Sequence, residues 1–583
     1  MRLATIDWIV VFAFLALSLA VGLALARRAG SSASEFFLSG RHMPWWLLGV
    51  SMVATTFSTD TPNLVTDIVR TNGVAGNWVW WAFLLTGMLT TFVYARLWRR
   101  SGVDTDVGFY ELRYSGRLAR FLRGFRAVYL GAFFNVMIMA SVTLAAIKIG
   151  GVLLGVTPVE TVLVAGTVTV LYSMLGGLTG VLVTDFVLFV VAMVGSIAAA
   201  VYALDRPEVG GLAGLLAHPS VAERLSFVPD FSDTSVAVGI FVVPLAVQWW
   251  SVWYPGSEPG GGGYVAQRML AARSEGHAQG ATLFFNVAHY ALRPWPWILV
   301  ALASLVVFPD LDSLRAAFPA VADSVVGHDL AYPAMLTFLP AGLLGLVVAS
   351  LAAAYMSTIS THLNWGASYL VHDLYKRFVA PDATDARLVA VGRCATVALM
   401  AAAGAISLLL SNALQAFQIL LQIGAGTGLL FLLRWFWWRV NAASELVAMS
   451  VSFLVAVYFR FVHARWTGAP LEGWQELVIG VAVTSVAWIA TALLTRPTAE
   501  ATLRDFYRAT RPGGPGWRVV RERAAAEGEP LPEGLARLPV GIACMALGCV
   551  AVYSALFATG SALYGRTGPA LALGAAAAAA AFA

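Results

Sequence analysis

The sequence predicts an all-α membrane protein that crosses the bilayer many times. Of its 583 residues, 59% are hydrophobic and only 12% are charged, and its mean hydropathy is +0.76. Apolar runs of about 18 residues or more recur along the chain, and each is long enough to cross a bilayer as a helix. This composition excludes an ordinary soluble domain. A transmembrane barrel would show short alternating segments instead.

The apolar runs predict about fourteen transmembrane helices. They lie near residues 8–26, 44–69, 75–98, 127–155, 158–176, 180–204, 235–254, 281–308, 332–372, 387–410, 413–438, 441–461, 473–495 and 538–560. The run at 332–372 is too long for one simple span, so we expect a strong tilt or an extension into the cytoplasm. We expect the first run to be retained rather than cleaved as a signal peptide, because its basic residues follow it.

The basic residues predict a multi-pass protein of the cell membrane with both termini outside. With fourteen spans, the cytoplasmic segments carry 27 of the 37 Lys and Arg residues and the external segments carry eight, an excess that is typical of cytoplasmic loops. The predicted cytoplasmic segments are 27–43, 96–126, 255–280, 373–393, 434–440 and 496–537. The net charge of +5 indicates a face against anionic lipid rather than a nucleic acid partner.

Two cytoplasmic segments carry further expectations. Arginines at 113, 117, 120, 123 and 126 are three or four residues apart. This spacing predicts that they share one face of an amphipathic helix at the membrane surface. Residues 496–537, with prolines and glycines at 512–515, are expected to form a linker.

Four ionisable residues inside predicted spans are candidates for function, because charge within a bilayer is costly. They are Asp60, Lys148, Asp185 and Arg293. The alternative for each is a buried ion pair or a side chain that reaches the membrane surface, and Lys148 lies near a helix end. For Arg293 the expected partners are Asp60 or an anionic or hydroxyl-rich solute.

The second predicted span carries polar residues and a proline at mid-membrane, in the run ATTFSTDTPN at 54–63. Proline removes a backbone donor and crowds the preceding turn, so carbonyls near 54–58 are expected to leave helical bonding. Irregular backbone at this depth survives where it is buried or lines a cavity. The seventh span is also interrupted, by Pro244 and by prolines and glycines at 255–263. Paired broken helices indicate an inverted-repeat transporter.

The ninth span places hydroxyl groups on one side of a helix. Ser357, Thr358 and Thr361 follow at i, i+1 and i+4, and a hard cation such as sodium prefers oxygen ligands. Intramembrane hydroxyls also bond commonly to their own helix or to a neighbour. The spacing alone does not decide between these two interpretations.

Four stretches of the chain resemble the sodium:solute symporter family, which includes sodium/glucose, sodium/proline and sodium/sialic acid transporters. They read FFLSGR at 36–41, YSMLGGLTGVLVTD at 172–185, YVAQR at 264–268 and AYMSTISTHLN at 354–364, which leads to DLY at 373–375. The stretches occur in the family's order, and the resemblance covers about residues 1–440. It implies a LeuT-type fold in which spans two to six and seven to eleven form two inverted five-helix repeats.

The resemblance also implies a division of the chain. Residues 1–43 would add an N-terminal transmembrane helix and a cytoplasmic loop, and 441–583 would add C-terminal helices around the basic loop 496–537. The transporter core would comprise 44–254 and 255–440, with the first repeat at 44–204 and the second at 235–440.

Sodium ligands follow from the resemblance, residue by residue. A first sodium ion would be held by the carbonyls of Ala54, Phe57 and Ala354 and the hydroxyls of Ser357 and Thr358. Some family members hold a second sodium ion, and the matching set here is Asp185, Ser357, Ser360 and Thr361. The presence of that set makes two sodium sites plausible.

The solute site implied by the resemblance includes residues from four spans. It would be lined by Thr56, Asp60, Thr61, Trp80, Arg293, Gln418 and Gln422, with Tyr264 as an inner gate. One departure affects the gate: sugar transporters of the family tend to have an Asn-Gln pair before this tyrosine, whereas this chain is rich in proline and glycine at 255–263.

These observations predict sodium-coupled symport of a small polar organic solute, such as a sugar, an amino acid or a carboxylate, by alternating access. One alternative is an uncoupled facilitator or channel of the same fold. Another is a membrane-embedded enzyme or a sensor. The nearest candidate for a catalytic pair, His372-Asp373, resembles a helix terminus, and the 496–537 loop is too short for a signalling domain. We predict no enzymatic activity, no cofactor other than one or two sodium ions, and no obligate protein partner. The three cysteines show no metal-ligand spacing.

Overall fold

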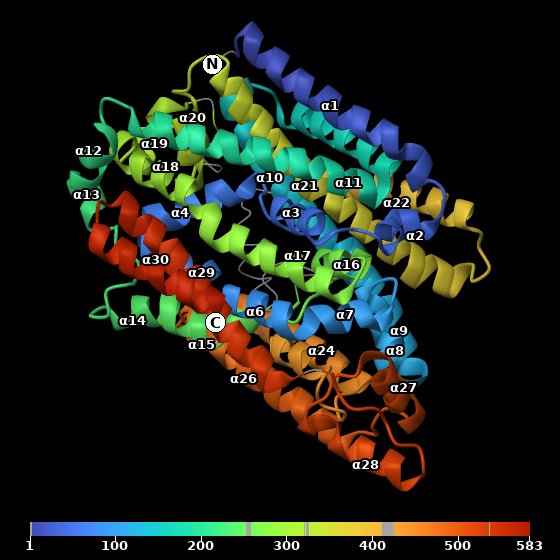
Figure 1. Cartoon of the computed structure of the whole chain (residues 1–583). Coiled ribbons are helices and arrows are strands. Elements are labelled where there is room, and N and C mark those ends of the chain that lie inside the picture. Colours follow the sequence, from blue (N-terminus) through green and yellow to red (C-terminus); the bar gives the residue numbers. More distant parts are fainter. Residues whose placement is uncertain are drawn as a thin grey trace.

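The computed structural model in Figure 1 is built from helices. It describes residues 3–251, 258–319, 321, 326–410, 424, 426–535 and 537–583. In the first half the main helices are α1 (Thr5–Ala29), α2 (Ala33–Leu38), α3 (Trp45–Thr55), α4 (Asp60–Asn72), α5 (Trp78–Trp81), α6 (Leu84–Leu89), α7 (Ala95–Ser101), α8 (Phe109–Arg113), α9 (Gly116–Val128), α10 (Asn135–Ile149) and α11 (Pro158–Leu204).

The second half continues the same architecture. Its main helices are α14 (Thr234–Ala237), α15 (Val243–Ala246), α16 (Gly263–Ala271), α17 (Glu275–Val287), α18 (Pro294–Val307), α20 (Ala331–Leu336), α21 (Leu343–Tyr369), α22 (Asp385–Ser407), α24 (Ala442–Tyr458), α26 (Gly473–Leu494), α27 (Glu500–Thr510), α28 (Arg518–Ala526), α29 (Leu538–Leu563) and α30 (Thr567–Phe582). Short π-helical turns join several of them, among them η9 (Ala288–Leu292) and η12 (Leu370–Val379). No β-strand occurs within the described ranges.

Ten of the described helical stretches are long and apolar enough to cross a membrane. Shorter apolar helices cover 45–55, 158–171 and 234–246, so thirteen of the fourteen predicted runs contain an apolar helix. Nearly half of the remaining run, 413–438, lies outside the described residues. An apolar helix that was not predicted, α30, follows α29 at the C-terminal end. The count of fourteen spans therefore stays a prediction.

The helix predicted to be broken at mid-membrane is broken there. It ends as α3 at Thr55 and resumes as α4 at Asp60. Pro62 lies in the first turn of α4, where its missing N–H has no helical partner to lose. The second predicted interruption is also present in the described residues, because Ser251 and residues 258–262 are not helical and α16 begins at Gly263.

Two glycines divide stretches that would be too long as straight helices. Gly177 has φ +53° and interrupts the 47 residues of α11, which separates the predicted runs 158–176 and 180–204. Gly342 has φ +83° and precedes α21. The run at 332–372 is therefore not one span, since it contains the end of α20 and the start of a helix that continues through η12 to Val379. Those 37 residues extend about 55 Å, beyond the hydrocarbon core of a bilayer.

The N-terminal helix α1 packs beside α11 and α21 (Figure 1). Asp7 at its start accepts hydrogen bonds from the backbone N–H groups of Gly342, at 2.6 Å, and Gly345, at 2.7 Å. A carboxylate at a helix N-terminus offsets the partial positive charge there. The first helix therefore fixes the start of the helix that carries the predicted sodium ligands.

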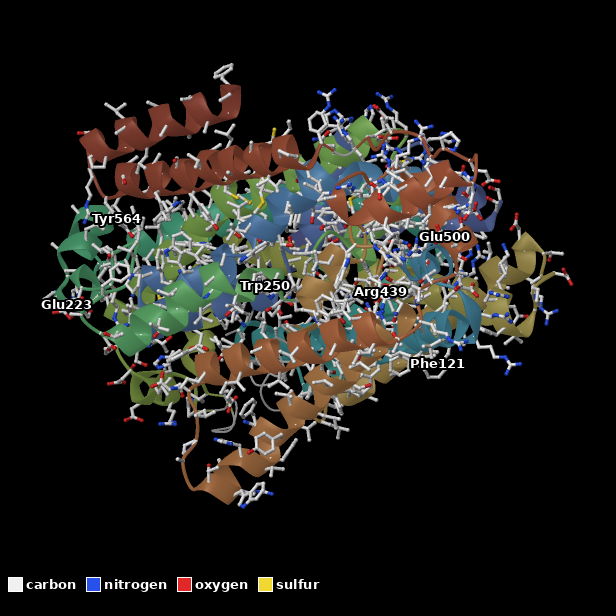
Figure 2. The ribbon with its side chains drawn as sticks, turned by 90° about the horizontal axis from the view of Figure 1, so that it is seen from below. Phe121, Glu223, Trp250, Arg439, Glu500 and Tyr564 are labelled. Atoms are coloured by element: carbon white, nitrogen blue, oxygen red, sulfur yellow. The ribbon has the colours of Figure 1, made fainter. Side chains whose placement is uncertain are left out.

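The six predicted cytoplasmic segments meet at one end of the molecule. Polar contacts join Arg41 to Asp104, Arg100 to Glu275, Arg123 to Asp373, Arg434 to Glu258, and Arg100 to the Thr510 carbonyl. Figure 2 shows Arg439 and Glu500 toward this end and Glu223 and Tyr564 toward the other. The grouping agrees with a shared side for these segments, and the orientation of the termini stays a prediction.

The opposite end has its own polar contacts. The Lys148 ammonium pairs with Asp329 at 2.9 Å. Arg70 donates to the carbonyls of Ser304, at 2.9 Å, and Phe308, at 2.8 Å. Lys148, one of the four candidate charges, therefore has an ion-pair partner near a helix end.

The arginine-rich stretch after the third predicted span does not form one amphipathic face. Extended backbone at Tyr114 and Ser115 separates α8 from α9. Arg113 and Arg126 are buried, whereas Arg117 and Arg120 are exposed. The prediction was wrong because spacing alone cannot indicate a break in the helix.

Residues 496–537 fold as a small helical unit rather than an extended linker. Phe506 and Trp517 are buried in it, and the Trp517 indole N–H donates to the Trp435 carbonyl at 2.8 Å. The Arg113 guanidinium lies over the Trp517 ring at 5.1 Å. Burial of these aromatic side chains holds α27 and α28 against the end of the core where the basic segments meet.

Candidate ion and solute site

The break between α3 and α4 is held by α21. The Thr358 hydroxyl donates to the Thr55 carbonyl at 2.7 Å, and the Thr55 and Thr361 hydroxyls lie 2.9 Å apart. Each partner is buried. A carbonyl that leaves helical bonding at the end of α3 is therefore satisfied from the helix that carries the hydroxyl-rich run.

The residues predicted for a first sodium ion all lie where these two segments meet. Ala54 belongs to the last turn of α3, Phe57 to the break, and Ala354, Ser357 and Thr358 to the middle of α21. All five are at most 2% exposed. The Ala54 carbonyl accepts the Phe57 N–H at 3.0 Å, so it retains a tight turn rather than being fully released.

Asp185 of α11 completes this region with a carboxylate. One of its oxygens accepts the Ser357 hydroxyl at 2.7 Å, and the other accepts the Ser51 hydroxyl at 2.5 Å. Asp185 is fully buried. Ser51, on α3, was not predicted, although it lies one helical turn before Thr55 on a face that meets α11 and α21.

The rest of the second predicted sodium set reaches Asp185 indirectly. Arg268 of α16 donates to the hydroxyls of Ser51, at 3.1 Å, and Thr361, at 2.8 Å. Ser360 donates to the Ser357 carbonyl, which is the local bonding that intramembrane hydroxyls commonly adopt. Asp185, Ser357 and Thr361 are therefore gathered around Ser51 and Arg268, whereas the Ser360 hydroxyl bonds back to its own helix.

His289 connects three of the residues predicted for the solute site. A nitrogen of its ring lies 3.0 Å from the Thr56 hydroxyl, the ring meets the Trp80 ring edge to face at 5.6 Å, and it is hydrogen-bonded to the Arg293 guanidinium. His289 is buried in the π-helical turn η9. Such turns occur often at functional sites, but the sequence offers no direct signal for one.

Arg293 lies beside the broken helix. One of its nitrogens is 3.4 Å from the Val53 carbonyl, and its guanidinium lies over the rings of Trp297, at 5.2 Å, and Phe57, at 5.9 Å. Its side chain is fully buried. Asp60 forms no ion pair with Arg293 within 4.0 Å among the described residues.

The remaining predicted solute residues differ in where the structure places them. Asp60 is the first residue of α4 and is partly buried. The hydroxyl of Thr61 donates to the Thr56 carbonyl at 3.3 Å, so it supports the break. Gln418 and Gln422 lie outside the described residues.

A pocket opens next to His289, on the side where the predicted cytoplasmic segments meet. It is lined by Phe83, Thr86, Gly87, Thr90, Glu258, Gly261, Tyr264, Val265, Thr282, Phe285, Asn286 and Tyr290. Tyr264, the predicted gate, is therefore one of its walls, and Tyr290 stacks on Trp80 at 5.8 Å. The hydroxyls of Thr86, Thr90 and Thr282 and the amide of Asn286 were not predicted as lining residues.

Charged residues lie at the pocket wall formed by Glu258. Glu258 pairs with Arg126 and with Arg434, the latter at 3.0 Å. Arg434 also pairs with Glu445 at 3.1 Å, and Glu445 accepts the Tyr114 hydroxyl at 2.8 Å. We call Arg126, Glu258, Arg434 and Glu445 the inner charge cluster, and all four are buried.

A family model relates the sequence of this chain to known proteins. The sodium:solute symporter family matches residues 36–452. This chain belongs to that family. The sodium/glucose cotransporter of Vibrio parahaemolyticus is 27% identical over 480 residues, which span 79% of this chain and 86% of that protein. The sodium/sialic acid symporter SiaT of Proteus mirabilis (strain HI4320) is 25% identical over 522 residues, or 86% and 97% of the two chains.

A solved structure supports the fold of this symporter-family chain. The substrate-bound outward-open state of a Na+-coupled sialic acid symporter aligns with a TM-score of 0.69 at 21% identity, covering 85% of this chain and 99% of that one. Family membership makes the chain a multi-pass membrane transporter rather than an enzyme, and implies sodium as the coupling ion. The predicted family assignment is thus confirmed.

Proposed function

We propose that this chain is a symporter that couples the entry of sodium to the entry of a small polar organic solute by alternating access. The observation that carries the proposal is the junction of the broken α3–α4 helix with α21. There buried backbone carbonyls, hydroxyls and the Asp185 carboxylate gather in one place. Oxygen donors of this kind suit a hard monovalent cation.

Two sodium ions are proposed at this junction. The first would take the carbonyls of Ala54, Phe57 and Ala354 with the hydroxyls of Ser357 and Thr358. The second would take the set that contains the carboxylate, namely Asp185, Ser357, Ser360 and Thr361. Ser51 joins the second proposed set because its hydroxyl already contacts Asp185. The bonds now made between these groups would be exchanged for bonds to the ions.

The solute is proposed to bind where the broken helix faces η9 and the pocket. Its proposed contacts are Thr56, Asp60, Thr61, Trp80, Arg293, Gln418 and Gln422, to which His289 is added. Tyr264 would form the inner gate, since it lies on the pocket wall beside the inner charge cluster. Movement of α16 would then open the pocket toward the cytoplasm.

Two features of topology belong to the same proposal. The spans at 44–204 and 235–440 are proposed to be inverted repeats, which the two broken helices support. Both termini are proposed to lie outside, because the basic segments meet at one end of the molecule. In such repeats the paired broken helices meet near the bilayer midplane and hold the ions and the solute.

Reconstituted transport tests the coupling. Proteoliposomes would be loaded without sodium, and uptake of labelled glucose, proline and N-acetylneuraminate would be measured with an inward sodium gradient. We expect at least one of the three compounds to enter only with sodium. Equal uptake with choline or potassium in place of sodium would favour the uncoupled facilitator. A sodium-dependent rise in melting temperature, measured without solute, tests ion binding separately.

A further inference from the structure

The buried arginines of this chain differ in what neutralises them. Arg434 contacts two carboxylates, those of Glu258 and Glu445. Within the part of the chain that the structure describes, Arg70 contacts no carboxylate, but it donates to two backbone carbonyls at no more than 2.9 Å. Arg293 has neither arrangement. A buried guanidinium is stable only when its charge and its N–H groups are matched.

Arg293 is incompletely matched within the described residues. Its recorded polar partners are the ring of His289 and the Val53 carbonyl, the latter at a long 3.4 Å. Its Nε has no hydrogen-bond partner although the atom is buried. The ring faces of Phe57 and Trp297 contribute cation–π attraction, which amounts to about 2 kcal/mol at most for a desolvated site.

Asp60 is the carboxylate that acts electrostatically on Arg293, yet it does not require the arginine. It occupies the first position of α4, where the helix N-terminus itself stabilises negative charge. Asp60 is also partly exposed, whereas Arg293 is fully buried. The positive charge of Arg293 is therefore available to another anion.

We infer that the solute of this symporter carries a carboxylate, and that Arg293, oriented by His289, binds it at the break between α3 and α4. The inference rests on the proposed function and narrows its solute class. The guanidinium offers two parallel N–H groups that match a carboxylate. The neighbouring Thr56 hydroxyl and Trp80 ring would contact the rest of the solute. His289 acts as a positioning residue through its bond to Arg293.

The test compares solutes that differ by one carboxylate. Purified protein in sodium would be heated with matched pairs: glucuronate and glucose, N-acetylneuraminate and its methyl ester, and nicotinate and nicotinamide. A ligand that binds the folded state raises the melting temperature. We expect a carboxylate to raise it in at least one pair while its neutral partner does not. A rise with a neutral partner alone, or with no carboxylate, would overturn the inference.

Variants show whether Arg293 is responsible. Arg293→Gln is expected to weaken binding of the active carboxylate about 10- to 100-fold, the strength of a charged hydrogen bond. Arg293→Lys should retain part of that affinity. The sodium-induced rise in melting temperature should persist in both variants. Unchanged carboxylate affinity in a folded Arg293→Gln protein would contradict the inference without affecting sodium coupling.

Arg70→Gln is the matched control. Arg70 is also buried, but it lies in the last turn of α4, away from the break, and donates to two backbone carbonyls. Its variant should lower the melting temperature without changing carboxylate affinity. If Arg293→Gln likewise lowers only the melting temperature, the arginine serves folding and the inference is overturned.

Discussion

Charged residues are arranged differently at the centre of this transporter and at the end where its basic segments meet. In the inner charge cluster two arginines face two glutamates, and Glu258 and Glu445 both contact Arg434. At the centre, Asp185 is surrounded by hydroxyls with Arg268 behind them, and Arg293 is bonded to an imidazole and a carbonyl. Both regions are buried to a similar degree.

On the proposed function, the difference separates charges that hold the fold from charges that serve transport. A fully paired buried cluster gains nothing from an added ion, and it is strongly destabilised when one member is removed. A carboxylate among hydroxyls, or an arginine without a carboxylate, can accept an ion or a solute without breaking a pair. Substitutions in the inner charge cluster should therefore lower stability, whereas substitutions at the centre should change ion or solute binding.

The largest effect is expected for Arg434→Met. The substitution leaves Glu445 and part of Glu258 without a counter-charge in a buried site, which costs about 3–5 kcal/mol. We expect a large fall in the melting temperature of the purified protein, of similar size with and without sodium. Arg518→Met is the control, because the exposed pair of Arg518 with Glu522 adds little stability. A stable Arg434→Met protein with altered sodium dependence would assign the cluster to transport instead.

Asp185→Asn should leave the fold intact and reduce the number of sodium ions coupled to each solute. The amide keeps an oxygen for one of the two serine hydroxyls but lacks the charge, so the second proposed sodium ion is lost while the first, held by neutral oxygens, remains. The Hill coefficient for sodium-dependent uptake should fall from about two to about one. The charge moved per solute should fall accordingly, measured by uptake at a set membrane potential.

Arg268 supplies the control for that experiment. If Asp185 only neutralises Arg268, the Asn variant should lose stability and the double variant Asp185→Asn/Arg268→Gln should regain it. The number of sodium ions would then be unchanged throughout. Retention of a Hill coefficient of about two in a stable Asp185→Asn protein would remove the second sodium site.

Patterns that depend on local chemistry could be predicted from the sequence. Polar residues followed by Pro62 located the break at mid-membrane, and the structure has it between Thr55 and Asp60. The hydroxyl run on α21 and the carboxylate Asp185 were predicted as one cluster, and they lie together. Each of these features could be predicted because its signal lies in neighbouring residues or in a family motif.

Features that arise from contacts between distant segments could not be predicted. In the sequence Ser51 is one serine in an apolar helix, and nothing nearby indicates a partner. Its contact with Asp185 arises only because α11 packs against α3. His289 gains its role from a π-helical turn that no spacing indicates. The aromatic residues of 496–537 gave no sign of burial, because the surface that covers Trp517 comes from another part of the chain.

The smallest effect is expected outside the membrane, at Glu111 of α8. Burial raises the pKa of this carboxyl group, but the hydrogen bonds and charges of Arg377 and Arg123 together lower it by more. The pKa therefore lies below its usual value of 4.5. A carboxylate whose pKa is lowered by folding adds stability above its unfolded pKa and loses it as the pH falls through the folded pKa.

Glu111→Gln should therefore lower the melting temperature at neutral pH, and the difference from the wild type should close below pH 4.5. Because the side chain is 21% exposed and salt screens such pairs, the effect should stay below about 1 kcal/mol. Glu522→Gln, in an exposed pair with Arg518, is the control and should change little at any pH. A difference that persisted in acid would mean that Glu111 contributes by packing rather than charge. A loss as large as that of Arg434→Met would extend the essential charge pairing beyond the inner charge cluster to the surface.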